Sequence, residues 1–126
     1  MSTLVTDSGF TPDDWNAGFD SAEAIDLASD ADPLNVAFDG VRMIRVDFPS
    51  FADGRGFTIA RQLRLRGYTG RLRAHGHVIA DQYAMARRSG FDEVEIPDSL
   101  AQRQPEDDWR ARADWQDGDY QARLRG

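Results

Sequence analysis

The stretch from Val41 to Pro97 decides the fold and reads VRMIRVDFPSFADGRGFTIARQLRLRGYTGRLRAHGHVIADQYAMARRSGFDEVEIP. Within it, short segments with the residue spacing of strands alternate with longer segments in which apolar residues recur at helical intervals. Three segments are predicted to be strands: 41–46, 71–75 and 92–96. Two segments between them are predicted to be helices: 57–66 and 78–89. Two successive strand–helix–strand crossovers predict a right-handed parallel arrangement, and hence an α/β fold.

Turn residues support these boundaries. Gly67 and Gly90 follow the two predicted helices, and glycine is the usual residue for a left-handed helix C-cap. Before the first crossover, Asp39-Gly40 suits a type I′ turn, so residues 34–38 and 41–46 are predicted to form a hairpin. This hairpin would add an antiparallel edge strand, which makes the predicted sheet small and mixed.

The flanks of this core differ in composition. Residues 1–33 are predicted to be an acidic, partly ordered arm in which residues 21–28 form a short helix. Residues 34–97 form the α/β core. Residues 98–126 are predicted to be a helical C-terminal extension that packs on the core and carries Trp109.

Composition excludes several classes of chemistry. The 126 residues are enough for one domain, and they include neither cysteine nor lysine, so thiolate, disulfide and Schiff-base chemistry are excluded. No apolar run is long enough to span a membrane, and no secretory signal is evident, so a cytoplasmic location is expected. The net charge of −7 argues against nucleic-acid binding.

The segment Asp53-Gly54-Arg55-Gly56 is a candidate anion site. It lies between a predicted strand and the following helix, where ligands of parallel α/β sheets collect. Two glycines would leave backbone N–H groups accessible at the helix N-terminus, and Arg55 would add a planar cation. The alternative is a tight turn in which Asp53 caps the helix and Arg55 pairs locally.

Two further groups have the residue types of metal sites. His75 and His77 could offer two imidazoles at a strand end, although no third ligand is evident from spacing. Asp47, Asp53 and Asp81 could likewise converge on magnesium. Ordinary loop histidines and solvated carboxylates are the alternative, and no bound metal or other cofactor is expected.

One run of sequence carries a family resemblance. The run from Asp47 to Arg64, DFPSFADGRGFTIARQLR, together with GYTGRLRA at 67–74, resembles the bacterial domain of unknown function 934 family. The element F-x-D-G-R-G-[FY]-[ST] is its most specific part, and the histidine pair at 75–77 departs from the family pattern. The positions that match the family motif are Phe51, Asp53, Gly54, Arg55, Gly56, Arg61, Asp81 and Gln82.

The resemblance implies a small cytoplasmic protein that is associated with sulfite reductase. The leading hypothesis is an accessory or binding protein of assimilatory sulfate reduction, which contacts sulfite reductase or another sulfur-assimilation protein through the Asp53–Gly56 loop. The rival hypothesis is a small oxidoreductase-like enzyme that uses a bound flavin or metal at the same edge. A third is a subunit that forms a homodimer through its exposed hairpin edge.

Overall fold

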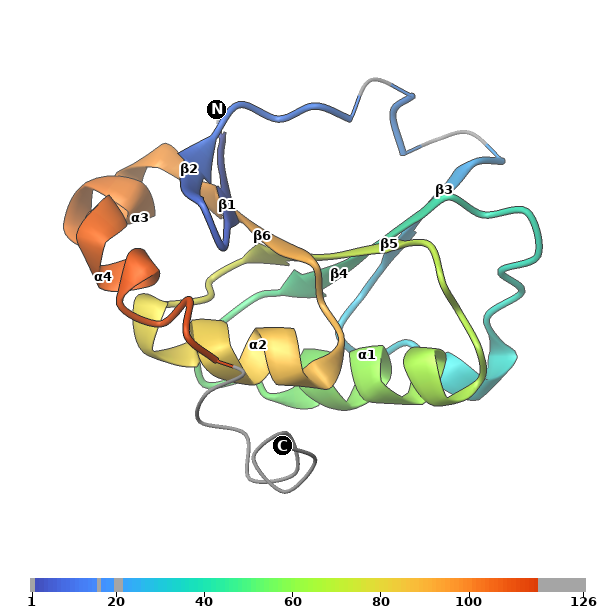
Figure 1. The fold of residues 1–126 in the computed structure, drawn as a ribbon. Helices are drawn as coiled ribbons and strands as arrows, with labels where there is room; N and C mark the ends of the chain where they lie inside the picture. Colours follow the sequence, from blue (N-terminus) through green and yellow to red (C-terminus); the bar gives the residue numbers. More distant parts are fainter. Residues whose placement is uncertain (1, 16, 20–21, 116–126) are drawn as a thin grey trace, which may run out of the picture.

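The computed structural model describes residues 2–15, 17–19 and 22–115, which form a six-stranded mixed sheet with helices on one face (Figure 1). The strand order across the sheet is β2-β1-β6-β5-β4-β3. The strands are β1 (Ser2–Thr6), β2 (Gly9–Thr11), β3 (Ala24–Leu27), β4 (Met43–Phe48), β5 (Arg71–Gly76) and β6 (Glu93–Pro97). The α-helices are α1 (Arg55–Leu65), α2 (Tyr83–Ser89), α3 (Asp98–Arg103) and α4 (Glu106–Arg110).

The predicted parallel crossovers are confirmed. Strands β3, β4, β5 and β6 run parallel, and α1 connects β4 to β5. The connection from β5 to β6 is a short 3-10 helix, Ala80–Gln82, followed directly by α2. Gly67 and Gly90 adopt positive φ angles of 99° and 117°, as expected after the two helices.

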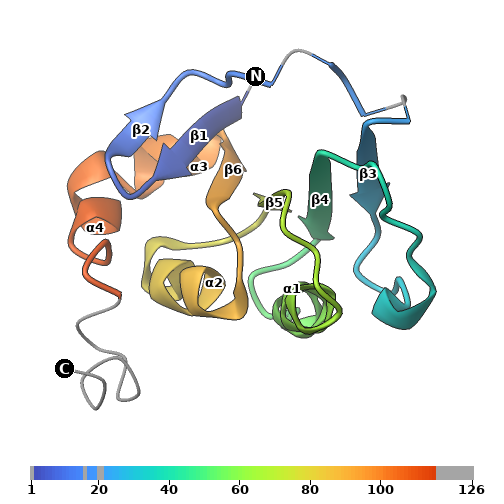
Figure 2. The same cartoon turned by 45° about the vertical axis from the view of Figure 1, so that its right-hand side comes forward.

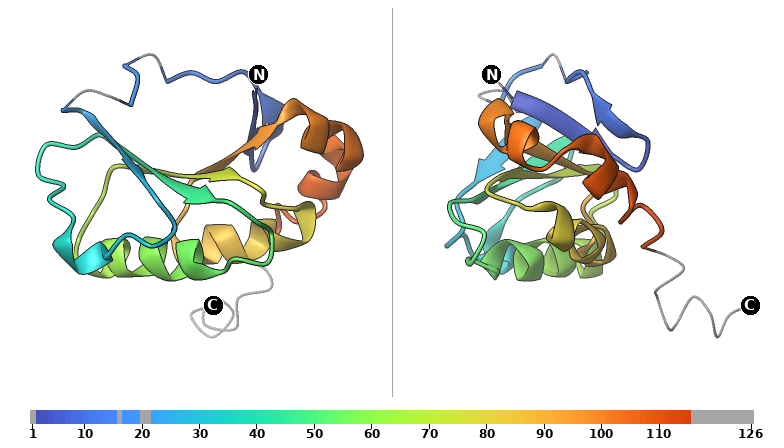
Figure 3. Two further views of the ribbon diagram at one scale, coloured as in Figure 1. Left: turned by 180° about the vertical axis from the view of Figure 1, so that it is seen from behind. Right: turned by 90° about the vertical axis from the view of Figure 1, so that its left-hand side faces the viewer.

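Helices α1 and α2 cover the same face of the sheet, while α3 and α4 lie beside the β1–β2 end of it (Figures 2 and 3). The core lies between the sheet and α1 and α2, and it contains buried side chains such as Ile44, Leu63, Leu72 and Tyr83. Trp109 of α4 belongs to the same apolar cluster and is only 1% exposed. None of the described helices is long and apolar enough to cross a bilayer.

The predicted hairpin over 34–46 is wrong. Asp39-Gly40 does form a turn, with Gly40 at a φ of 78°, but residues 33–35 form a 3-10 helix. Asp32 caps this helix by accepting from the amide of Leu34, and Pro33 begins it. The hairpin of the sheet instead joins β1 and β2 at the opposite edge, from residues 2–11.

The predicted helix over 21–28 is also wrong where the structure describes it, since Ala24–Leu27 is strand β3. It pairs in parallel with β4, from Ala24 opposite Met43 to Leu27 opposite Val46. Ile25 and Leu27 pack against the core, as alternate residues of a strand do. The apolar spacing of this segment suits either structure, and pairing with β4 selects the strand.

The second face of the sheet is charged rather than apolar. Along β5 and β6, the side chains that alternate with the core residues are Arg71, Arg73, His75, Glu93 and Glu95. The chain between β2 and β3 crosses this face (Figure 1). We call its residues 12–15 and 17–19 the strap.

The strap contacts the charged face through ionic and aromatic groups. Arg73 donates to both carboxylate oxygens of Asp13, at 3.0 and 3.1 Å. The guanidinium carbon of Arg45 lies 3.8 Å from the centroid of the Phe19 ring, a cation–π contact. The strap thus covers polar side chains that would otherwise face solvent.

Candidate functional site

The loop between β4 and α1, residues 49–54, lies at the carboxyl edge of the parallel strands, where the sequence predicted a site. Two hydrogen bonds fold it into a tight turn. The amide of Asp53 donates to the carbonyl of Ser50 at 3.0 Å, and the amide of Ala52 donates to the Ser50 hydroxyl at 3.1 Å. The loop therefore has a defined backbone shape at the start of α1.

Asp53 and Arg55 form a closed ion pair at the end of this loop. Arg55 donates from Nε to Oδ1 of Asp53 at 3.0 Å and from Nη2 to Oδ2 at 2.7 Å. The Arg55 amide also donates to Oδ1, at 3.1 Å. The side-chain hydrogen bond from Arg55 is the main reason that the pKa of Asp53 is lowered to about 2. This is the local pair that the sequence left open as an alternative.

Arg55 also reaches a loop that the sequence did not connect with it. Its Nη2 donates to the hydroxyl of Ser29, which follows β3, at 2.9 Å. Because β3 and β4 are parallel neighbours, their following loops meet at this edge of the sheet. Within the described residues, Nη1 of Arg55 is the guanidinium nitrogen that has no protein acceptor, so the pair leaves little of the cation for an anion.

The two glycines of the motif have different roles. A Cβ on Gly56 would lie 2.4 Å from Cζ of the buried Phe48 ring, so this position lets the start of α1 pack directly on β4. The nearest atom to a Cβ on Gly54 is Cδ2 of Phe57, at 4.0 Å, which is an ordinary contact. Gly54 has a φ of −87°, which other residues adopt readily. The close packing of Gly56, rather than special backbone angles, explains a glycine there.

The two glycines provide a matched test. Gly56→Ala is expected to lower the free energy of unfolding by about 1–3 kcal/mol, because the added methyl overpacks the Phe48 site. Gly54→Ala is expected to change it by less than about 0.5 kcal/mol. Urea denaturation of both variants measures the difference. Equal stabilities would show that the Phe48 ring moves aside without cost, contrary to this explanation.

Phe51 and Gln82, two motif residues that are distant in sequence, are brought together. Gln82 donates from Nε2 to the carbonyl oxygen of Phe51 at 2.7 Å, and its Oε1 accepts from the amide of Ile79 at 3.1 Å. Gln82 thereby joins the 49–54 loop to the beginning of α2. The aromatic ring of Phe51 is not packed inside, since the residue is 60% exposed.

The remaining motif residues do not join this cluster. Asp81 pairs with Arg112 at 2.6 Å, and both side chains are largely exposed. Arg61 is exposed on α1, about two turns beyond Arg55, and has no polar partner among the described residues. The structure therefore assembles Phe51, Asp53, Arg55 and Gln82 at one edge.

Among the described residues, the two histidines do not belong to a group of three or more possible metal ligands. His75 lies between two carboxylates, with Nδ1 3.7 Å from Asp47 and Nε2 3.4 Å from Glu95. His77 is exposed in the loop that follows, and its amide donates to the carbonyl of Phe48 at 2.9 Å. Across the described ranges, no three His, Cys, Asp or Glu side chains are placed to hold a metal ion. The same finding applies to Asp47, Asp53 and Asp81.

Sequence reasoning missed the charge pairing across β5, β6 and the strap. Arg73 is fully buried and donates to Glu93 at 2.6 Å and to Glu95 at 2.9 Å, besides Asp13 of the strap. A signal was present, because arginine alternates with apolar residues in 71–75 and glutamate does so in 93–96. Opposite charges on neighbouring strands are a known pairing pattern.

Comparison with known proteins agrees with the resemblance drawn from the motif. The family model described as "Bacterial protein of unknown function (DUF934)" matches residues 17–126, which include the 49–54 loop, α1 and α2. Comparison with curated proteins and with solved structures finds no match. The match covers most of the chain, and the chain therefore belongs to the bacterial protein family of unknown function DUF934.

Proposed function

We propose that this protein is an accessory binding protein that docks on a partner protein through the 49–55 edge, with Phe51 as the central anchor. The observation that supports this most is the exposure of Phe51, which is 60% exposed on a loop whose backbone is hydrogen-bonded on both sides. Aromatic side chains are enriched among the residues that dominate binding energy in protein interfaces.

The fixed shape of the loop favours binding over a purely incidental exposure. The Ser50 turn, the Gln82 side chain and the Asp53–Arg55 pair each restrain a different part of the loop. A loop whose backbone is held in place before binding loses less conformational entropy when a partner covers it. The restrained backbone at Phe51 would therefore lower the entropic cost of binding.

Two charged residues follow this anchor in the loop and at the start of α1. Asp53 and Arg55 neutralise each other at 2.7 Å, and the Arg55 side chain remains 59% exposed. A paired, partly exposed ion pair costs less to desolvate at an interface rim than an isolated charge does. The arrangement of an apolar anchor beside a neutralised polar rim suits a protein surface better than it suits a free small anion.

The partner that we propose is sulfite reductase, in assimilatory sulfate reduction. This choice rests on the resemblance to the family through the motif at 51–58, and the exposed anchor supplies the surface that such a partner would cover.

Phe51→Ala is expected to weaken binding to sulfite reductase by about 30-fold, which corresponds to an anchor worth about 2 kcal/mol. Isothermal titration calorimetry with purified sulfite reductase measures the dissociation constant. Because Phe51 is exposed, the variant is expected to keep its stability within about 0.5 kcal/mol of the original.

Leu65→Ala is the matched control. Leu65 is 74% exposed at the far end of α1, about 15 Å along the helix from the loop, and its loss should leave the affinity unchanged. If the unaltered protein does not bind sulfite reductase, the proposed partner is wrong. If it binds but Phe51→Ala and Leu65→Ala have equal effects, the proposed surface is wrong.

A further inference from the structure

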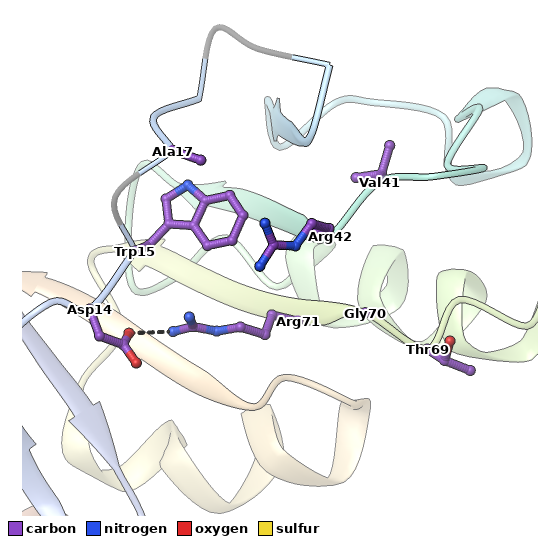
Figure 4. Close-up of a pocket in the computed structure, with 8 residues that line it drawn as sticks. All are labelled: Asp14, Trp15, Ala17, Val41, Arg42, Thr69, Gly70 and Arg71. Carbon is purple, nitrogen blue, oxygen red and sulfur yellow. Dashed lines mark hydrogen bonds and ion pairs between the residues drawn. The ribbon is translucent and has the colours of Figure 1, made fainter.

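A cavity of about 840 Å³ lies at the opposite, amino edge of the strands, between the strap and the residues that precede β4 and β5 (Figure 4). The strap contributes Asp14, Trp15 and Ala17. The walls from the core are Val41, Arg42, Thr69, Gly70 and Arg71. Its volume is within the range of small-molecule sites. The 49–55 loop takes no part in it, so it is independent of the proposed docking edge.

Trp15 forms an aromatic wall whose position is fixed. Its indole Nε1 donates to the carbonyl of Gly18 at 2.7 Å, and the side chain is half-buried. The guanidinium carbons of Arg42 and Arg71 lie 5.5 and 5.9 Å from the centroid of its ring. One aromatic surface and two cations therefore face one another across a small space, as Figure 4 shows.

The two arginines differ in how fully they are engaged. Arg71 donates to Glu93 at 2.7 Å and to Asp14 at 2.8 Å, so its charge is compensated and so is that of Asp14. The side chain of Arg42 is 67% exposed, and its ion pair with Glu23 is long, at 3.5 Å. Exposed ion pairs of this kind contribute little to stability. Arg42 is thus the cation of the cavity that a ligand can engage.

Backbone donors lie beside Arg42. The neighbouring amides of Tyr68 and Arg71 donate to the carbonyls of Leu63 and Arg42. Between them, the amides of Thr69 and Gly70 donate to no acceptor in the part of the chain that the structure describes. A Cβ at Gly70 would lie 2.4 Å from the hydroxyl oxygen of the buried Tyr68 and 3.0 Å from the carbonyl oxygen of Arg42, so this position has no room for a side chain. Thr69 and Gly70 both line the cavity, so two N–H groups without a protein acceptor among the described residues belong to its wall.

We infer that this cavity binds an aromatic phosphate of the nucleoside monophosphate class. The phosphate accepts hydrogen bonds from Arg42 and from the amides of Thr69 and Gly70, and the base packs against the indole of Trp15. A phosphate has three terminal oxygens and can accept from all three groups, and guanidinium and backbone N–H groups are its common ligands in proteins. Aromatic stacking supplies the remaining affinity.

The experiment uses adenosine monophosphate as the probe, added to the full chain labelled with ¹⁵N. The expected result is saturable movement of the Trp15 indole N–H signal, which Trp15→Phe identifies, with a dissociation constant below 1 mM. Adenosine, which lacks the phosphate, and inorganic phosphate, which lacks the ring, should each bind at least ten-fold more weakly. If either binds as tightly as adenosine monophosphate, the inference is overturned.

Arg42→Gln tests the cation directly and is expected to weaken binding of adenosine monophosphate by at least ten-fold. Arg61→Gln removes an exposed arginine of α1 that lies outside the cavity, and it should leave the affinity unchanged. Circular dichroism confirms that both variants fold. Unchanged affinity in Arg42→Gln, equal losses in both variants, or movement of signals other than those of the cavity would each overturn the inference.

Discussion

Arg73→Met is expected to lower the free energy of unfolding by about 3–5 kcal/mol, because Glu93 and Glu95 each lose one of their two arginine partners inside the protein. Arg73 has an exposure of 0%, and its partners Glu93 and Glu95 are 5% and 6% exposed. Burial opposes its charge, but the carboxylates of Asp13, Glu93 and Glu95 more than compensate and raise the pKa of Arg73. Methionine fills similar space but provides none of these hydrogen bonds.

Urea denaturation at pH 7 measures this loss, and its pH dependence gives a second test. Burial raises the pKa of Glu95, yet the hydrogen bond from Arg73 and the charges of His75 and Arg45 leave it below its usual value. A lowered pKa adds stability at neutral pH that is lost as the pH falls through that pKa. The difference in the free energy of unfolding between the variant and the unaltered protein should therefore become smaller in acid.

Arg42→Met is the matched control for this prediction. Its ion pair with Glu23 is exposed on both sides, so the substitution should cost less than about 1 kcal/mol. A loss in Arg73→Met that is no larger than the loss in Arg42→Met would show that the buried pairs contribute little to stability. A difference in the free energy of unfolding that grows in acid would contradict the assignment of the loss to the carboxylates that Arg73 pairs with.

Trp109→Ala is expected to lower the free energy of unfolding by about 3–5 kcal/mol, the usual cost of removing a large buried aromatic side chain. The Trp109 ring meets Tyr83 of α2 edge to face, with centroids 6.0 Å apart, and its Nε1 donates to the carbonyl of Gln104 at 2.8 Å. Truncation would remove these contacts and leave a cavity under α4.

Thermal or urea denaturation measures this effect, with Met85→Ala as the control. Met85 is 53% exposed on α2, so its truncation should change stability by less than about 0.5 kcal/mol. If Trp109→Ala proves as mild as Met85→Ala, then α4 lies on the core without stabilising it. The expected loss instead makes the helices after β6 part of the cooperative unit.

The central crossovers were predictable because each depends on local signals. Residues 57–66 have one apolar face, and Gly67 and Gly90 end helices in the conformation that glycine favours. These preferences hold whatever the rest of the chain does. The predicted boundaries of β5 and β6 differ from the structure by only one residue at each changed end.

The edges of the sheet were not predictable in the same way. Residues 24–27 have apolar spacing that fits a helix or a strand, and only the free edge of β4 makes the strand the better choice. Residues 34–38 looked like a strand, but Asp32 and Pro33 begin a 3-10 helix there. The first error concerns a segment whose structure depends on a distant strand, whereas the second overlooked a local cap at Asp32 and Pro33.

The candidate site also combines a contact that depends on local sequence with contacts that depend on distant segments. The local pairing of Asp53 and Arg55 could be foreseen because they lie two positions apart along a tight turn. The contact from Gln82 to the carbonyl of Phe51 joins residues 31 positions apart, and it has no signature in a single sequence. The cavity beneath the strap depends likewise on where Trp15 lies over Arg42.

The amino-acid sequence by itself determined the parallel α/β core, the helix ends at glycine, the family motif and the chemistry that the chain lacks. Tertiary structure alone decided the two sheet edges, the burial of Arg73 between glutamates, and the exposure of Phe51 on a restrained loop. The physical reason is the sequence distance over which each interaction acts. Backbone propensity and capping act within one turn, whereas strand pairing and ion pairing depend on which distant segment of the chain lies beside the residue in the fold.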